Sequence, residues 1–178
     1  MKKALLVIDL QNDYLGENRK KQFSYDTEKL IKSVNALIES YHKDGCDIIY
    51  IEHNIQNFWT NRILFGHSIA GTDGAKLYGG LKIVSDIRFV KLFSDAFSSK
   101  EFRNFISEKK YESVAICGLD ENGCVSATAK GAIKNGLAVE MLMVGIATRF
   151  PISKVEKLRE KLKAKGVKYI CEGDSYGK

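Results

Sequence analysis

Six apolar runs of strand length recur along the chain, and they restrict its possible folds more than any other feature. Most of them are continuous Val, Ile and Leu, without the apolar–polar alternation of a strand that has one exposed face. Such runs are typical of strands that are buried on both faces, as in a parallel sheet. The runs cover residues 4–9, 47–52, 84–91, 113–118, 137–144 and 167–171.

Most segments between these runs carry helical patterns. In residues 26–44, and in the stretch after Pro151, apolar residues recur at the spacing of an amphipathic helix. The start of the second helix carries Pro151 and a Ser153-x-x-Glu156 capping box, two signals of a helix N-terminus. Because strands and helices alternate throughout residues 1–178, we expect one α/β domain in which helices cover both faces of a parallel sheet.

The composition fits a globular protein and argues against several other classes. Hydrophobic residues make up 44% and charged residues 28% of the 178 residues, so a sizeable core is expected. The first apolar run ends at Asp9, too early for a signal peptide, and no run nears the roughly 18 residues that span a bilayer. We therefore expect a cytoplasmic protein with no membrane partner, whose four cysteines are thiols. The net charge of +6 is scattered and lacks a nucleic-acid-binding signature, so no nucleic-acid partner is expected.

Polar residues follow several of the apolar runs. In an open α/β sheet, ligands bind at the carboxyl ends of the strands. This rule brings Asp9, Glu52, Lys91 and the loop 118–124 to one edge of the molecule. The glycine-dotted stretch 53–81 has no clear period, and a loop of this length is typical of a lid or a pocket wall.

The loop 118–124 leads from an apolar strand into a helix that we predict over 124–135. It matches a phosphate-binding loop up to Gly123, but Cys124 stands where that motif has its lysine. A thiol at a helix start lies beside unpaired N–H groups and a positive macrodipole, so we expect a lowered pKa and a reactive thiolate. The same donors suit an oxyanion. A small buried hydrophobe is the alternative for Cys124, and both interpretations stay open.

A reactive cysteine requires a base and an orienting group, and two strand ends supply candidates. Asp9 ends an apolar strand, where a carboxylate is costly unless it has a partner or a role. Lys91 ends another strand, where no residue close in sequence pairs with it. The alternatives are that Asp9 caps the following turn and that Lys91 reaches the surface. Cys117 lies inside an apolar run and is interpreted as packing.

Three motifs together resemble those of the isochorismatase-like cysteine hydrolases, the nicotinamidase/isochorismatase superfamily. They are VIDLQNDYL at 7–15, VKLFSDAF at 90–97 and CGLDENGCVSATAKGAIKNG at 117–136. They occur in the order and at the spacing of that family, and the resemblance extends over nearly the whole chain.

The resemblance implies a fold, a site and a reaction. It implies a three-layer α/β/α sandwich with a six-stranded parallel sheet, assembled as a homo-oligomer (dimer or tetramer). It places Asp9, Lys91 and Cys124 at the catalytic triad positions, and it implies a cis peptide bond between Leu119 and Asp120. The backbone N–H groups of Asp120 and Cys124 would then form an oxyanion hole. The implied reaction is cleavage of the C–N bond of a small amide, ureido or imide substrate through a thioester, without a cofactor.

Several residues near these motifs are candidates for the walls of a substrate pocket. Phe58, Trp59 and Phe97 would suit a flat substrate, with core packing as the alternative. Asp120 and Glu121 stand where the family has small or hydroxyl residues, so they would favour neutral or cationic substrates if they faced the pocket and mean little if they faced solvent. The candidate set is Asp13, Tyr14, Phe58, Trp59, Phe97 and Leu119.

Other departures from the family pattern concern metal binding and support. Nicotinamidases of this family carry an Asp-x-His…His metal site, which this chain lacks. A metal held by Glu52, His53 and His67 is the alternative, but we predict no metal site and disfavour nicotinamidase activity. Asp95 is an apparent insertion in the second motif, and Gly145 replaces an acidic residue that the family has after the fifth strand.

Two other functions compete with the hydrolase interpretation. The protein could be a non-catalytic small-molecule binding or scaffold protein that retains the fold, in which case Cys124 would react slowly with iodoacetamide. It could also bind a nucleotide at the loop 118–123, which the missing lysine makes the weakest hypothesis.

Overall fold

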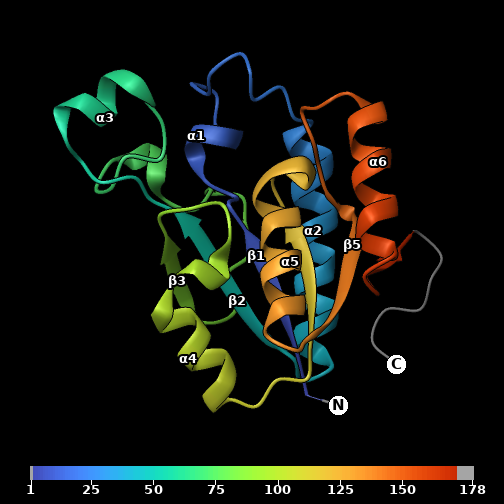
Figure 1. Cartoon of the computed structure of the whole chain (residues 1–178). Helices are drawn as coiled ribbons and strands as arrows, with labels where there is room; N and C mark the ends of the chain where they lie inside the picture. The colour runs from blue at the N-terminus through green and yellow to red at the C-terminus, as the bar shows by residue number, and fades with distance from the viewer. Residues whose placement is uncertain (1, 172–178) are drawn as a thin grey trace.

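Six parallel strands form one sheet within residues 2–171, the part of the chain that the computed structural model describes (Figure 1). The strand order is β3-β2-β1-β4-β5-β6. Strands β2 and β3 lie on one side of β1, and β4, β5 and β6 lie on the other, so the topological switch point lies between β1 and β4. The strands are β1 (Lys3–Ile8), β2 (Asp47–His53), β3 (Arg88–Lys91), β4 (Ser113–Gly118), β5 (Ala138–Ile146) and β6 (Lys168–Ile170).

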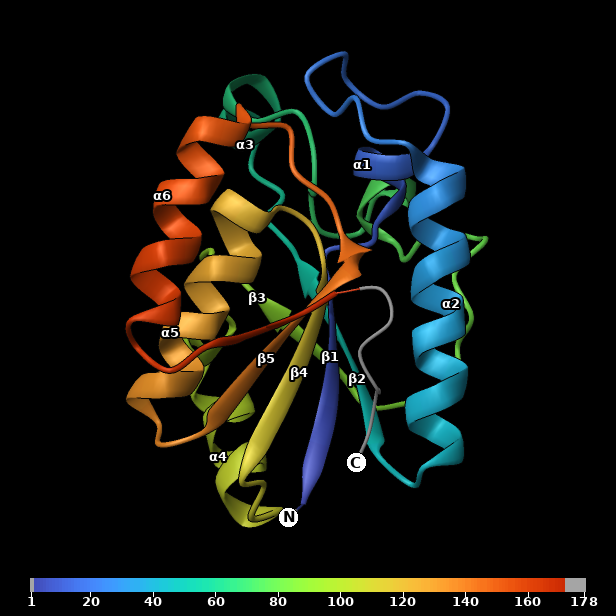
Figure 2. The same ribbon diagram turned by 90° about the vertical axis from the view of Figure 1, so that its right-hand side faces the viewer.

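Helices cover both faces of this sheet, which confirms the expected three-layer sandwich. Figure 2 shows α2 on one face and α4, α5 and α6 on the other. The side chains of β1 alternate between two cores, with Leu5 and Val7 on the α2 side and Leu6 and Ile8 on the opposite side. The helices are α1 (Asn12–Leu15), α2 (Thr27–Lys43), α3 (Trp59–Leu64), α4 (Lys100–Glu108), α5 (Ser126–Lys134) and α6 (Ile152–Lys163). Shorter turns are η1 (Asp73–Ala75), η2 (Ala96–Ser98) and the π-helical η3 (Glu121–Val125).

The register of the central strands brings their carboxyl ends to one edge. Ile8 pairs with both Ile51 of β2 and Gly118 of β4, and Lys91 pairs with His53. Gly118 has a φ of 118°, and a Cβ there would collide with the backbone of Ile8. Glycine is therefore required where β4 passes β1 and turns into the cysteine loop.

The amphipathic pattern of residues 26–44 correctly predicts α2. Asp26 is the N-cap residue, and its side chain accepts a hydrogen bond from the backbone N–H of Lys29 at 3.1 Å. The apolar stripe faces the sheet, because Val34 and Ile38 are fully buried against it. The helix ends at Lys43, with Asp44 as its C-cap residue, within one residue of the predicted stretch at both ends.

The start of α6 corrects one prediction. The helix begins at Ile152 after Pro151, and no side chain caps it. Ser153 already lies in the first turn, so the predicted capping box with Glu156 was wrong. The fixed φ of Pro151 explains the start that the structure has, since proline is compatible with a helix N-terminus.

Strand β3 is shorter than the apolar run 84–91 from which it was predicted. Its first part is held against β2 through side chains instead of a backbone ladder: the N–H of Val84 donates to the Tyr50 hydroxyl at 3.1 Å, and Ser85 donates to the Ile48 carbonyl at 2.5 Å. The ladder starts only at Arg88, close to the site edge.

The irregular stretch 53–81 contains α3 and η1 and lies over the carboxyl edge of the sheet (Figure 1). An isolated bridge between Ile55 and Ile69 joins two parts of the stretch, and a second bridge, between Gln11 and Leu77, fastens it to the segment after β1. None of the helices in the described residues is long and apolar enough to cross a membrane.

Candidate active site

Two charged residues from separate strands meet at the carboxyl edge of the sheet. The Nζ of Lys91 donates to Oδ2 of Asp9 at 2.8 Å, and the two side chains are only 1% and 4% exposed. Burial acts to lower the pKa of Lys91, but the attraction of Asp9 and Cys124 outweighs it and raises that pKa. Lys91 is therefore a buried cation and does not reach the surface.

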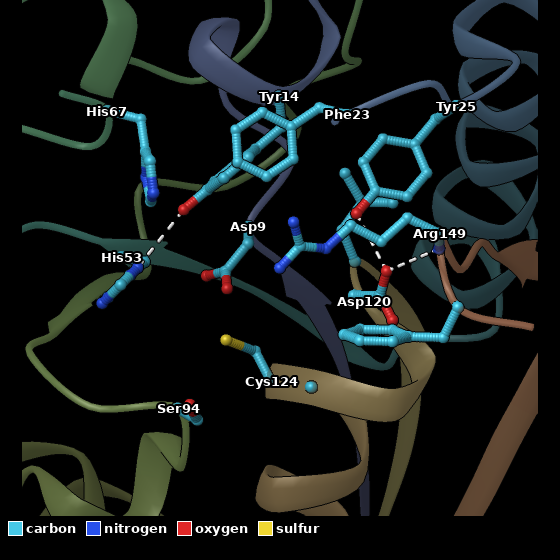
Figure 3. A pocket seen from close by; sticks show the side chains of 13 residues that line it. Asp9, Tyr14, Phe23, Tyr25, His53, His67, Ser94, Asp120, Cys124 and Arg149 are labelled. Carbon is cyan, nitrogen blue, oxygen red and sulfur yellow. Dashed lines mark hydrogen bonds between the residues drawn. The ribbon is translucent and has the colours of Figure 1, made fainter. Parts of the chain in front are cut away.

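The second carboxylate oxygen of Asp9 is open. Oδ1 is buried and has no hydrogen-bond partner among residues 2–171. Figure 3 shows the sulfur of Cys124 directed toward this carboxylate. Buried polar atoms are nearly always paired, so an open carboxylate oxygen beside a thiol marks a position where a proton can be accepted.

The pKa of the Cys124 thiol is raised, and our prediction of a lowered value was wrong. Burial has the largest effect and the Asp9 carboxylate the next, and together they raise the pKa to about 12 against the opposing effect of Lys91. The predicted helix start also lies elsewhere: α5 begins at Ser126, and Cys124 belongs to the π-helical turn before it. At neutral pH Cys124 is a protonated thiol, which needs a base to become a nucleophile.

A cavity of about 190 Å³ lies over Asp9 and Cys124. Its walls come from the segments that follow β1, β2, β3, β4 and β5, together with the loop before α2 (Figure 3). The volume suits a small molecule. The lining residues are Asp9, Tyr14, Phe23, Tyr25, His53, His67, Ser94, Leu119, Asp120, Gly123, Cys124, Arg149 and Phe150.

A hydrogen-bonded chain holds one wall of this cavity. Ser68 and the Tyr14 hydroxyl lie 2.6 Å apart, and the same hydroxyl lies 3.3 Å from Nδ1 of His53. The other ring nitrogen of His53 lies 3.2 Å from the Leu92 carbonyl, which can only accept, so Nε2 carries the hydrogen. Burial, and then the Lys91 charge, lower the pKa of His53. This wall is therefore uncharged at neutral pH.

Asp120 lines the cavity, but its carboxylate is occupied. Oδ1 accepts from the Asn122 N–H and the Thr148 hydroxyl, both at 2.9 Å. Oδ2 accepts from the Tyr25 hydroxyl at 2.9 Å and the Arg149 N–H at 2.8 Å. These bonds fix the loop in which the Leu119–Asp120 peptide bond is cis.

Glu121 points away from the cavity into the protein. Its two oxygens accept from Nε and Nη2 of Arg159 at 2.6 and 2.7 Å. The Glu121 side chain is 1% exposed, so this bidentate pair joins the cysteine loop to α6. Of the two loop acids, only Asp120 therefore faces the site.

Two of the six predicted pocket residues, Tyr14 and Leu119, line the cavity. Asp13 does not, because its carboxylate turns away and accepts from the Ser68 N–H at 2.6 Å. Asp13 thus fastens the stretch 53–81 to the segment after β1.

The three predicted aromatic walls are wrong. Phe58 and Trp59 lie beside and on α3, 58% and 73% exposed and outside the cavity lining. Phe97 is buried in the core against Phe102, with ring centroids 4.9 Å apart. Asp95 explains that placement, since its carboxylate accepts from the Phe97 N–H at 2.8 Å and forms the turn that sends the ring inward.

The alternative metal site does not form. Both ring nitrogens of His53 are engaged by Tyr14 and Leu92. Within the part of the chain that the structure describes, no three His, Cys, Asp or Glu side chains gather in a way that could hold a metal. Glu52, His53 and His67 therefore do not fit a zinc ion, and no step is derived through one.

Sequence reasoning missed several cavity residues. Arg149 and Phe150 follow β5, so the carboxyl-end rule could have found them. Phe23 and Tyr25 lie in a loop that carries no motif, and only the packing reveals them. Gly145 lies inside β5 and not after it, where its missing side chain lets α2 pack closely.

Taken together, the fold and this site define a class: parallel α/β proteins that hold a cysteine beside a buried Asp–Lys pair at the carboxyl edge of the sheet. The family model described as "Isochorismatase domain" matches residues 3–171. The chain belongs to the isochorismatase family, which confirms the resemblance of its motifs.

Individual relatives are distant in sequence and close in fold. An uncharacterized isochorismatase family protein of Bacillus subtilis is 24% identical over 149 residues, 83% of this chain and 79% of the relative. A probable inactive nicotinamidase of Arabidopsis thaliana is 28% identical over 144 residues, 73% of this chain and 72% of the relative. The structure of an N-carbamoylsarcosine amidase from Thermoplasma acidophilum is similar with a TM-score of 0.82 at 20% identity, over 99% of this chain and 100% of that one. A zinc-bound pyrazinamidase of Pyrococcus horikoshii gives 0.81 at 23% identity, over 96% and 99%.

Proposed function

We propose that this protein is a cysteine hydrolase that cleaves the C–N bond of a small amide, ureido or imide substrate. The observation that carries the proposal is the open Oδ1 of Asp9, buried beside the Cys124 thiol while Lys91 holds the other oxygen. An open base next to a protonated nucleophile is the starting arrangement of covalent catalysis. The amidase described among the structural neighbours supports the same reaction class.

In the first step, Asp9 takes the proton of the Cys124 thiol as the sulfur attacks the substrate carbonyl carbon. The carbonyl π electrons move to oxygen, and the backbone N–H groups of Asp120 and Cys124 stabilise the resulting oxyanion. Lys91 stays protonated and limits the cost of charge on the sulfur.

In the second step, the oxyanion collapses and the C–N bond breaks, while protonated Asp9 gives its proton to the leaving nitrogen. This leaves an acyl thioester on Cys124. Asp9 then takes a proton from water as the water oxygen attacks the thioester carbonyl carbon. The C–S bond breaks, Asp9 returns the proton to the Cys124 sulfur, and the carboxylic product leaves. The protein ends the cycle in its starting protonation state.

An ammonia-release screen over small amides and ureides tests the proposal. The parent protein should release ammonia from at least one member of the panel, and Cys124→Ala should release none while keeping the parent's unfolding transition. Equal turnover by the alanine variant would show that the cysteine is not the nucleophile.

A non-catalytic small-molecule binding protein is the second candidate function. The Arabidopsis relative described as a probable inactive nicotinamidase favours it. This candidate predicts saturable binding of a small ligand to the parent without ammonia release or covalent modification of Cys124. We also propose that the protein is cytoplasmic and forms a homo-oligomer, a dimer or a tetramer, as the family resemblance implies. Sedimentation velocity would test the oligomeric state.

A further inference from the structure

Among the helices of residues 2–171, α3 differs from the others because none of its own residues is buried. Figure 1 shows α3 at the outer edge of the molecule, on the side of β3. Seven of the ten exposed large apolar side chains in the described residues lie on α3, beside it, or directly after β3, and they are 43% to 74% exposed. These seven, which we call the α3 face, are Phe58, Trp59, Ile63, Leu64, Phe65, Leu92 and Phe93.

The α3 face is larger than the apolar surface that a monomer usually exposes. With about 200 Å² for each large side chain, the exposed fractions leave on the order of 800 Å² of apolar surface. The largest apolar patch on a typical monomer covers about 300–600 Å². A stable protein–protein interface buries about 800 Å² on each partner. The α3 face therefore has the area that one such contact requires.

The α3 face has a hollow part and a projecting part. A groove of about 520 Å³ lies between α3 and the segment after β3, and its apolar lining consists of Ile55, Phe65, Leu92 and Phe93. The three most exposed side chains of the face lie outside this lining, and they are Trp59, Ile63 and Leu64. In a two-fold contact the same surface meets itself. The projecting side chains of each copy can therefore enter the groove of the other.

Charge does not oppose such a contact, although the whole chain has a net charge of +6. Arg62 is the one charged residue of α3, and it lies outside the groove lining. The polar side chains of that lining are the neutral Gln56 and Asn61 and the two histidines, His53 and His67. Burial, acting first, lowers the pKa of both histidines, so their rings are neutral at neutral pH. The groove can therefore be covered without burying a charge.

We propose that the α3 face is a two-fold contact between two copies of this chain. Its area, its uncharged groove and the projecting side chains beside that groove fit a second copy, whereas a flat lipid surface would leave the groove unfilled. The contact also reaches the active site, since His53 and His67 line both the groove and the cavity over Cys124. A seated partner supports this wall of the cavity from outside. Only this last step rests on the proposed function.

Trp59 is the only tryptophan in the chain, so its fluorescence reports directly on the α3 face. We expect short-wavelength emission from the associated protein and a shift to longer wavelength on serial dilution, as the ring becomes exposed to water. Sedimentation velocity over the same concentrations should show the assembly dissociating at the same midpoint.

Two variants test the two parts of the face. Leu64→Glu places a charge on the projecting part, and Phe93→Glu places one in the groove. Each should weaken association at least about thirtyfold, the loss typical of a hot-spot residue, and should keep the parent's far-UV circular dichroism because both side chains are exposed. Ile152→Glu, which changes an exposed apolar residue outside the α3 face, is the matched control and should associate as the parent does.

Several outcomes would overturn the contact. They are a parent that stays monomeric, association that survives both Leu64→Glu and Phe93→Glu, and association that Ile152→Glu weakens as strongly as those two variants do. Flotation of a monomeric parent with vesicles of phosphatidylcholine and phosphatidylserine, lost in Leu64→Glu, would assign the face to a lipid surface instead. Ammonia release decides the hydrolase separately, since an assembled protein without turnover would retain the contact and reject the reaction.

Discussion

Two carboxylates of this protein are buried beside a cation, and the occupancy of their oxygens differs. Glu121 uses both oxygens in a bidentate pair with Arg159. Asp9 uses only one, with Lys91, and its other oxygen is buried without a partner in the described residues. A saturated pair fastens one segment to another, here the cysteine loop to α6.

The open oxygen of Asp9 has a different consequence. A buried acceptor without a hydrogen-bond partner destabilises the folded state, and such destabilising features tend to cluster at functional sites. Asp9 lies beside Cys124 in the cavity wall, whereas Glu121 lies outside it. The two pairs differ in unused hydrogen-bonding capacity and not in the burial of their carboxylates, and this difference is why the proposed mechanism assigns the proton acceptor to Asp9 and not to Glu121.

The largest expected effect is on turnover. Asp9→Asn keeps an oxygen for Lys91 but removes the proton acceptor, so hydrolysis of the best amide from the screen should fall by about 10²–10⁴-fold. Glu121→Gln should keep turnover within about tenfold, because that carboxylate touches no reacting group. Initial rates of ammonia release measure both. A larger loss for Glu121→Gln than for Asp9→Asn would break the comparison.

The second-largest expected effect is a loss of stability, and it concerns the Glu121–Arg159 pair. Arg159→Met leaves Glu121 buried and unpaired, which should lower the free energy of unfolding by about 3 kcal/mol, the lower end for a broken buried pair, because the Arg159 side chain is 27% exposed. Urea unfolding measures it. The double variant Glu121→Gln and Arg159→Met should recover much of the loss, and a double variant no more stable than Arg159→Met would contradict the pairing.

The smallest expected effect is a loss of folding stability at acidic pH. His53 has a lowered pKa in the folded protein, through burial first and Lys91 second, so the unfolded chain binds its proton more readily. The contribution is fully present above the ordinary value of about 6.5 and is lost as the pH falls through the folded pKa. Stability should therefore drop by at most about 1.4 kcal/mol per pH unit for this group.

Urea unfolding between about pH 7 and 5, of the parent and of His53→Gln, measures this loss. Glutamine can accept from Tyr14 and donate to Leu92, so the variant should keep these bonds and lose the pH-dependent part. An identical pH slope in both proteins would exclude His53 as the source.

How far the sequence predicts this molecule depends on the kind of signal. Continuous apolar strands and the α2 stripe are strong periodic signals, and they predicted the layers and the sheet edge. The strand-end rule likewise brought Asp9, Lys91 and Cys124 to one place. Pro151 correctly marked the start of α6, but the capping box was wrong because several residues there can cap a helix, and only the backbone decides between them.

The site residues that the sequence missed depend on tertiary contacts. No local sequence signal indicates that Asp95 directs Phe97 into the core. Likewise, none indicates that the Asp120 carboxylate accepts hydrogen bonds from Tyr25 and Thr148. The pKa of Cys124 was misjudged for the same reason, because burial and the Asp9 charge arise only in the folded chain.

The alkylation rate of Cys124 as a function of pH, in the parent and in Asp9→Asn, tests most directly whether the open carboxylate acts on the sulfur. In the parent, the pKa of about 12 predicts slow reaction with iodoacetamide that rises about tenfold per pH unit from about pH 7 upward. Slow labelling of the parent by itself therefore no longer separates the hydrolase from a non-catalytic binding protein, and the comparison with Asp9→Asn takes its place. Asp9→Asn removes the negative charge and leaves Lys91, so the thiol pKa should fall and labelling near pH 7 should become faster even though turnover is lost. Parental labelling rates in Asp9→Asn across that range would mean that Asp9 does not act on Cys124, and the account would fail.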